Sequence, residues 1–163
     1  MVGTFGAYPS ARDFFEAVRG ASVEAERTRL TLMRMEASEG VRAQSYEAHG
    51  KSGHRADATA RTDSRMDYEA RVDGRMRDDY DLIGLACRVL YGDGTGRGGI
   101  DALMGSAVAD CLSFRYVDAR PWPEVAALTG YSERQCMRLC EQGVDAADFL
   151  GMANCVGGVG DAT

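Results

Sequence analysis

Proline, histidine and lysine are scarce in this chain, whose 163 residues include 3 prolines, 2 histidines and a single lysine, Lys51. Little proline allows long uninterrupted helices, and the 20 glycines supply the breaks between them. No apolar run approaches the roughly 18 residues that a membrane-spanning helix needs. The beginning of the chain also lacks the basic flank and apolar core of a secretory signal. The protein is therefore expected to be cytoplasmic, with no membrane partner.

The cysteines do not form the pattern of a disulfide framework, because there are five of them at wide spacing in a chain without an export signal. Cys136 and Cys140 lie four residues apart and would offer two metal ligands from one helix, but no second cysteine pair accompanies them. Both histidines, His49 and His54, lie far away in a polar stretch. The cysteines are expected to be small buried hydrophobic side chains, with no bound metal.

The sequence also lacks the motifs of common enzyme sites. The glycine-rich run 92–100 satisfies G-x-G-x-x-G, but no strand precedes it and no βαβ unit surrounds it. A calcium loop beginning at Asp93 would place Arg97 and Met104 at ligand positions, which does not suit the ion. No enzymatic activity and no cofactor are predicted, and residues 92–100 are expected to be a flexible linker.

Charge limits how tightly this chain would bind nucleic acid. A dedicated DNA-binding domain usually has a basic footprint, whereas the net charge here is −6. Residues 101–150 contain eight acidic side chains and only four basic ones, Arg115, Arg120, Arg134 and Arg138. Any binding to DNA is therefore expected to be weak alone and to need a partner that holds the protein in place.

Residues 10–38 are predicted to form a long helix, which Ser10 and Asp13 would begin. Its apolar and small side chains recur at alternating spacings of four and three. The recurring positions are Phe14, Val18, Ala21, Ala25, Thr28, Leu32 and Met35. This spacing is typical of a coiled-coil seam, which would pack either on a helix of the same chain or on a second copy in a homodimer.

A second long helix is predicted over residues 63–91, so that 10–91 would form an antiparallel helical hairpin. Its apolar stripe consists of Met66, Met76, Tyr80, Ile83, Cys87 and Leu90. The polar stretch 40–62 is expected to connect the two helices without regular structure. The ends of the chain, 1–9 and 151–163, are expected to be disordered.

Residues 101–150 are predicted to form a three-helix unit of the helix-turn-helix type. The first helix covers 101–117, and Pro121 prevents it from continuing. A short helix follows over 122–128, and Gly130 permits the tight turn after it.

Ser132 is predicted to open the last helix, with Gln135 three residues later in the spacing of a capping box. The side chains expected in the core are Tyr116, Trp122, Val125, Ala126, Leu128, Tyr131, Cys136 and Leu139. The opposite face of the last helix then carries Arg134 and Arg138, one turn apart. Two such arginines are typical of a helix that enters the major groove.

The candidate DNA-contacting residues are Ser132, Glu133, Arg134, Gln135, Met137, Arg138 and Arg120. Arg115 has two interpretations of equal weight, a phosphate contact and an intramolecular partner. The all-α architecture expected overall is a coiled-coil-like hairpin followed by the helix-turn-helix unit.

The segment 115–139 resembles the C-terminal part of the phage-encoded RinA/ArpU-type transcription regulators, which are similar to the region-four helix-turn-helix of sigma-70-type factors. The matching residues are Arg115, Tyr116, Trp122, Glu124, Val125, Ala126, Gly130, Tyr131, Ser132, Arg134, Gln135, Arg138 and Leu139. The resemblance implies a regulator of phage or prophage genes that acts with RNA polymerase. It also implies that Ser132 is a cap and that Arg134, Gln135 and Arg138 contact DNA.

The chain departs from that family pattern at five positions. Pro121 replaces a capping serine, whose side-chain acceptor is worth about 1 kcal/mol. Ala119 replaces a glycine, while Cys136, Met137 and Cys140 replace an aliphatic residue, an aromatic residue and a histidine. Two other functions stay open on the sequence. One is a DNA-packaging adaptor similar to small terminase subunits, and the other is a helical interaction module that binds no DNA.

Overall fold

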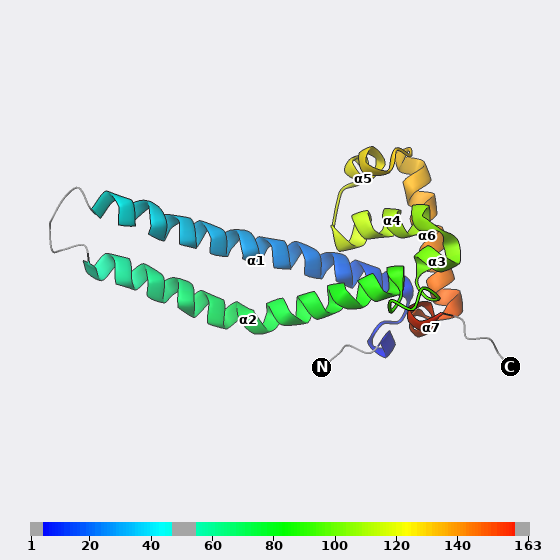
Figure 1. Cartoon of the computed structure of the whole chain (residues 1–163), viewed down its shortest axis with the longest axis horizontal. Helices are drawn as coiled ribbons and strands as arrows, with labels where there is room; N and C mark the ends of the chain where they lie inside the picture. The colour runs from blue at the N-terminus through cyan, green and yellow to red at the C-terminus, as the bar shows by residue number, and fades with distance from the viewer. Residues whose placement is uncertain (1–4, 47–54, 159–163) are drawn as a thin grey trace. The chain divides into compact units, whose positions relative to one another are not determined.

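The computed structural model describes residues 5–46 and 55–158, and the side chains of 5–40 and 59–158. Every regular element in these ranges is helical, so the predicted all-α class is confirmed (Figure 1). Two long helices, α1 (Ala11–Tyr46) and α2 (Arg55–Tyr91), precede a set of short ones. No described helix combines the length and the apolar character that crossing a membrane requires.

The chain divides into two compact units. Unit 1 consists of Met1–Val23 and Asp79–Thr163, and unit 2 is Glu24–Asp78. Unit 1 therefore contains the predicted helix-turn-helix segment together with the first turns of α1 and the last turns of α2. The predicted boundary at the glycine-rich run 92–100 is wrong, because the division falls within the two long helices instead.

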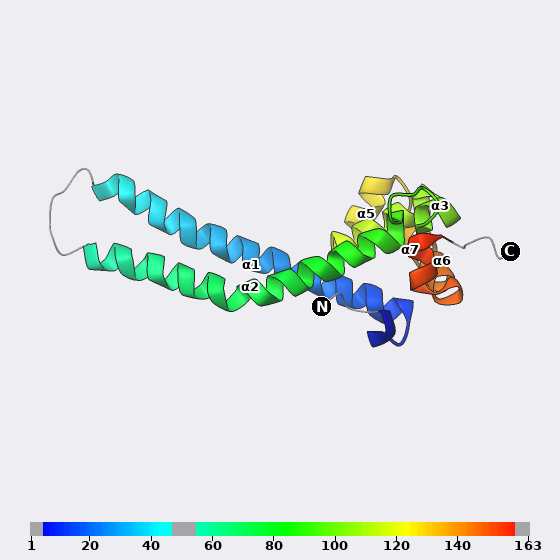
Figure 2. The same ribbon diagram turned by 60° about the horizontal axis from the view of Figure 1, so that its bottom comes forward.

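Unit 2 is a pair of antiparallel helices that run side by side in both ribbon views (Figures 1 and 2). The predicted seam of α1 faces inward here: Ala25 and Thr28 are buried, and Leu32 and Met35 are half-buried. On α2, Val72 is buried as well. The seam is filled within one chain, so burying it does not require a second copy.

The predicted apolar stripe of α2 is partly wrong, because Met66 and Tyr80 are 58% and 51% exposed. The side chains of one buried or half-buried row follow a four-three spacing. They are Arg65, Glu69, Val72, Met76, Asp79, Ile83, Ala86 and Leu90. This row shares Met76, Ile83 and Leu90 with the predicted stripe but has Arg65 and Asp79 where the stripe had the next residues, Met66 and Tyr80. One residue corresponds to a rotation of about 100° around a helix, so a stripe chosen from apolar residues alone missed the charged members of the seam.

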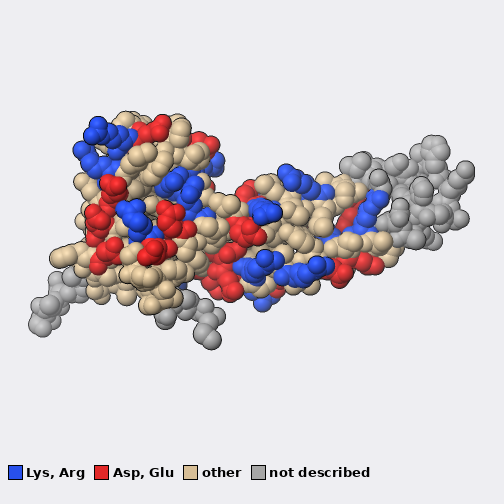
Figure 3. Space-filling model, turned by 180° about the vertical axis from the view of Figure 1, so that it is seen from behind, with Lys and Arg blue, Asp and Glu red and all other residues tan. Residues whose placement is uncertain are grey.

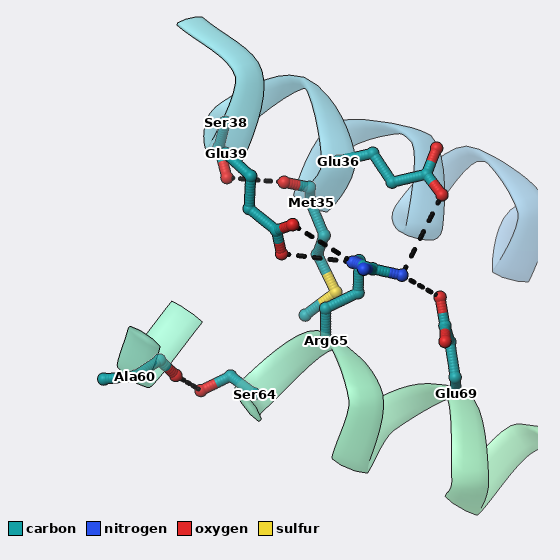
Figure 4. Close-up of polar contacts among 8 residues, drawn as sticks. All are labelled: Met35, Glu36, Ser38, Glu39, Ala60, Ser64, Arg65 and Glu69. Atoms are coloured by element: carbon teal, nitrogen blue, oxygen red, sulfur yellow. Dashed lines mark hydrogen bonds and ion pairs between the residues drawn. The ribbon is translucent and has the colours of Figure 1, made fainter. Parts of the chain in front are cut away.

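Arg65 occupies the seam of unit 2 as part of a charged cluster (Figure 4). Its guanidinium donates to Glu39 of α1, with the Nε atom 3.1 Å from Oε1, and to Glu69 one turn along α2. The Oε1 atom of Glu36 lies 4.0 Å from the Nη1 atom of Arg65. The hydrogen bond with Glu69, and after it the one with Glu39, raises the pKa of Arg65 above its ordinary value. The cluster joins the two helices at a position where apolar packing is sparse.

The two long helices also extend into the predicted connector 40–62. α1 continues to Tyr46 and α2 begins at Arg55, so the expectation of irregular structure is wrong at both ends of that stretch. Residues 47–54 lie outside the described part. Alanine, glutamine and arginine in this stretch favour helix, and a polar composition alone does not separate an exposed helix from a loop.

Unit 1 is built around Phe14 and Phe15 of α1, both fully buried. The rings of Phe5 and Tyr8 pack edge-on against Phe14, with centroids 5.6 and 5.3 Å away. A 3-10 turn, η1 (Phe5–Ala7), holds this segment. The prediction of disorder for 1–9 is therefore wrong over residues 5–9, while 1–4 lie outside the described residues.

The chain after Gly151 is also ordered over most of its described length. α7 (Met152–Gly157) buries Met152 and Cys155 in the core of unit 1, so the predicted disorder of 151–163 is wrong up to Gly158. The segment is too short to show a helical period, and the apolar contacts that order it come from distant parts of the chain. Residues 159–163 lie outside the described part.

The glycine-rich run is packed at its end rather than flexible throughout. Gly98 and Gly99 are buried, and the amide of Gly99 donates to the carbonyl oxygen of Cys155 in α7. A Cβ atom on Gly98 would overlap the backbone of Val156. The linker interpretation is wrong here because these glycines permit a close approach between two backbones.

The predicted helix 101–117 is broken into three pieces. These are α3 (Ile100–Met104), α4 (Ser106–Leu112) and a π-helical turn, η2 (Ser113–Val117). Gly105 separates the first two with a φ of 96°, which interrupts the regular hydrogen bonds. α4 then packs against the last long helix of the unit, α6 (Glu133–Leu150).

Candidate nucleic-acid interface

α5 (Trp122–Thr129) and α6 form a helix-turn-helix. Gly130 ends α5 in the left-handed conformation, with a φ of 76°, and its amide donates to the carbonyl oxygen of Ala126. Two residues later the Oγ of Ser132 accepts a hydrogen bond of 3.2 Å from the amide of Gln135. The turn and the cap lie at the residues that the sequence indicated for them.

The side chains beneath the turn anchor α5 and α6. Val125 and Cys136 are fully buried and Tyr116 is 4% exposed. Thr129 extends the inner face of α5, because its Oγ1 lies 3.3 Å from the Sγ of Cys136 and also donates to the carbonyl oxygen of Val125. Three further side chains of the predicted core are half-buried: Trp122, Ala126 and Leu139.

Leu128 and Tyr131 do not belong to this core, contrary to expectation. Leu128 is 56% exposed and Tyr131 is 37% exposed. α5 has only 8 residues, and Val125 and Thr129 already occupy its inner face. Leu128 therefore lies beyond the edge of that face, although its hydrophobic character suggested burial.

α6 crosses α4 at close range at Gly143. A Cβ atom at this position would lie 2.5 Å from the Cδ1 of Leu112 and 2.7 Å from the Cγ1 of Val108. Because a larger residue would force the two helices apart, Gly143 sets how deeply α6 is seated on the core. The outer face of α6 is fixed by the same contact.

Three thiols lie within this contact, and all are free: Cys111 on α4, and Cys136 and Cys140 on α6. Burial raises the pKa of Cys140 to about 12. Burial, and then the neighbouring Cys136 thiol, also raise the pKa of Cys111 to about 12. Cys111 and Cys140 are therefore protonated near neutral pH, and all three thiols pack as small hydrophobic groups. Within the described residues, no three His, Cys, Asp or Glu side chains are arranged to hold a metal ion.

The outer face of α6 carries the candidate contact residues. Arg134 and Arg138 are both exposed, and they line an open depression of about 490 Å³. Its other lining residues are Ser132, Gln135, Met137 and Glu141. Glu133 is exposed beside them without lining the depression. Five of the seven predicted DNA-contacting residues thus share one surface.

The two arginines of this depression make no salt bridge in the described part of the chain. Basic side chains gather at the upper edge of unit 1 in Figure 3, the edge that carries α5 and the beginning of α6 in Figure 1. Acidic side chains are mixed with basic ones over that whole face, the upper edge included. The charge of Arg134 and Arg138 is thus available to a ligand.

Arg115 is used inside the protein. Its guanidinium carbon lies 4.4 Å from the centre of the Trp122 ring, and Nη1 donates to the carbonyl oxygen of Arg120 over 3.1 Å. This favours the intramolecular interpretation over a phosphate contact. Arg120 forms a salt bridge of 3.1 Å with Glu124, so its charge is partly neutralised although its side chain is 53% exposed.

The turn before α5 contains an alanine in an unfavourable conformation. Ala119 has a φ of 53°, the left-handed region, and stands where the resembling family has glycine. Hydrogen bonds from the amides of Asp118 and Arg120 to the carbonyl oxygens of Ser113 and Phe114 hold the turn closed. The sequence pattern indicated a substituted glycine, but only the structure shows that the backbone keeps the conformation that glycine would favour.

Comparison of the chain with protein-family models, with curated proteins and with solved structures finds no match in any of the three.

Proposed function

We propose that this protein is a DNA-binding transcription regulator that inserts α6 into the major groove. The observation that carries the proposal is the pair of exposed arginines, Arg134 and Arg138, on the outer face of the second helix of a helix-turn-helix. An α-helix fits the major groove of B-form DNA, and arginine binds guanine O6 and N7 through two hydrogen bonds. Ser132 caps the start of this helix, and Gln135 lines the same depression as the arginines, which supports its assignment as a further DNA contact.

The charge distribution supports weak binding by the protein alone. Unit 1, which contains the helix-turn-helix, has 14 acidic and 8 basic residues, whereas unit 2 has 11 of each. The whole net charge of −6 therefore belongs to unit 1. A protein that contacts few phosphates loses most of its affinity at physiological salt, so stable occupancy requires a partner that raises the local concentration.

RNA polymerase is the partner that the sequence pattern favours. The segment 115–139 resembles the RinA/ArpU-type phage regulators and the sigma-70 region-four motif, and proteins of these kinds act beside polymerase. The proposal is thus a sigma-like regulator of phage or prophage genes. The closed seam of unit 2 favours it over a ring-forming packaging adaptor, because Ala25, Thr28 and Val72 are already buried within one chain.

The test compares the full-length protein with an Arg134→Ala/Arg138→Ala variant in binding to duplex promoter fragments at several salt concentrations. Fluorescence anisotropy is measured with and without polymerase. The double variant is expected to bind the promoter fragments at least tenfold more weakly at each salt concentration, because both guanine contacts are lost. Equal binding by the variant would overturn the groove-reading role.

The matched control is Arg27→Ala/Arg77→Ala, which removes the same charge from exposed side chains of unit 2. This control is expected to bind DNA as the unchanged protein does. Circular dichroism establishes that both variants keep their helices. A control that weakens binding as much as the α6 variant would assign the effect to net charge and contradict the proposal.

A further inference from the structure

Glu141 is the acidic member of the depression that Arg134 and Arg138 line. Residues 134, 137, 138 and 141 are spaced by three, four and seven, so they share one face of α6. All four side chains are exposed and all four line the same surface. A helix that places Arg134 and Arg138 in the groove therefore places Glu141 there as well, one turn further along.

A carboxylate in the major groove weakens binding unless it finds a hydrogen-bond donor. It lies between two rows of phosphates of the same charge, and it is desolvated when the groove closes over it. Cytosine presents its N4 amino group in the major groove, and Glu or Asp side chains accept hydrogen bonds from it. Guanine and thymine present acceptors at the corresponding edge and would repel the carboxylate. Adenine presents its N6 donor beside the N7 acceptor, so cytosine is the base that offers the carboxylate a donor without an acceptor next to it.

We infer that Glu141 is a specificity-determining residue that selects a cytosine beside the guanine bound by Arg138. The inference rests on the proposed function. Three residues along a helix advance about 4.5 Å, close to the roughly 3.4 Å between successive base pairs, so Arg138 and Glu141 reach neighbouring pairs. Arg134, about 6 Å from Arg138 along the axis, reaches a guanine one or two pairs away on the other side.

The role of Glu141 in this arrangement differs from that of the arginines. Arg134 and Arg138 add affinity for every duplex through the phosphates and for guanine through its edge. Glu141 lowers the affinity for every duplex that lacks cytosine beside the guanine bound by Arg138. It therefore discriminates between sequences by repelling the wrong bases. An acidic residue on a DNA-facing surface is thereby explained by selectivity rather than by affinity.

The experiment is selection of bound duplexes from a randomised library with full-length protein at low salt, followed by titration of the selected site and its single-base-pair variants. The unchanged protein is expected to select two guanines and an adjacent cytosine. Glu141→Gln removes the charge but keeps the size of the side chain. It is expected to bind non-selected duplexes more tightly and to lose at least tenfold of its preference for that cytosine.

Asp145→Asn is the matched control, because it removes a charge of the same sign from α6 at an exposed position that neither lines the depression nor belongs to the candidate contact residues. It is expected to raise general affinity while keeping the cytosine preference. A cytosine preference that survives in Glu141→Gln, or that is lost equally in Asp145→Asn, overturns this inference and leaves DNA binding intact. Failure of the unchanged protein to enrich or bind any duplex at low salt overturns the proposed function itself.

Discussion

The guanidinium of Arg115 stacks on the indole ring of Trp122, with 4.4 Å between the guanidinium carbon and the ring centre. Arg115 belongs to the π-helical turn η2, and Trp122 is the first residue of α5. The stacking therefore joins the helix that precedes the helix-turn-helix to the first helix of the motif. Arginine stacks on an aromatic ring through its planar face, which lysine lacks.

Replacing Arg115 by alanine is expected to lower the free energy of unfolding by about 1 to 2 kcal/mol, since both the stacking and the hydrogen bond to the carbonyl of Arg120 are lost. Arg115→Lys keeps the charge and is expected to recover less than half of the loss. Urea denaturation measures both. Arg120→Ala serves as the control, because it breaks only an exposed pair worth about 0.5 kcal/mol or less.

A different pair of results would support the phosphate-contact interpretation of Arg115. If Arg115→Ala leaves stability unchanged but lowers the salt dependence of DNA binding, the side chain would contact phosphates instead of acting inside the protein. The two readouts therefore separate its two interpretations.

Ala119→Gly is expected to stabilise the protein by about 0.5 kcal/mol. The left-handed conformation at a φ of 53° costs alanine about 1 kcal/mol or more, and the larger backbone entropy of glycine in the unfolded chain offsets part of the gain. Thermal unfolding followed by circular dichroism measures the change. Ala127→Gly, at an exposed position inside α5, is the control and is expected to destabilise by about 1 kcal/mol. Equal losses in both variants would show that Ala119 is not strained.

Stability is expected to fall as the pH rises above about 9. Burial, the main cause, raises the pKa of Cys140 from 9.0 to about 12 in the folded state, and that of Cys111 likewise. Because the folded state holds these protons more tightly than the unfolded chain does, the two thiols make their full contribution to the free energy of unfolding at pH values below the pKa of the unfolded chain. The advantage is lost between pH 9 and 12, by on the order of 1 kcal/mol per pH unit for each thiol.

Urea denaturation at pH values from 7.5 to 10.5 tests this dependence. A Cys111→Ala/Cys140→Ala variant is expected to show a shallower loss above pH 9, whatever its stability at pH 7.5. The difference in slope between the variant and the unchanged protein then measures the contribution of the two thiols. Parallel curves for the variant and the unchanged protein would contradict the assignment.

Local pattern alone determined the seam of α1, the turn and cap between α5 and α6, and the outer face of α6. The seam of α1 from Phe14 to Met35, the turn at Gly130 and the cap at Ser132 depend on spacings within a few residues, which the helical period makes readable. The exposure of Arg134 and Arg138 follows from the same period, because burial of Cys136 and Cys140 places the arginines opposite.

Contacts between distant residues decided the rest. Phe5 and Tyr8 are ordered by Phe14, and Gly99 is held by Cys155, although neither segment has a period of its own. Arg65 enters the seam of unit 2 because Glu39 on the other helix compensates its charge. Arg115 turns to Trp122 instead of solvent for a similar reason. A side chain whose environment depends on a partner far along the chain is placed only when the tertiary structure brings that partner to it.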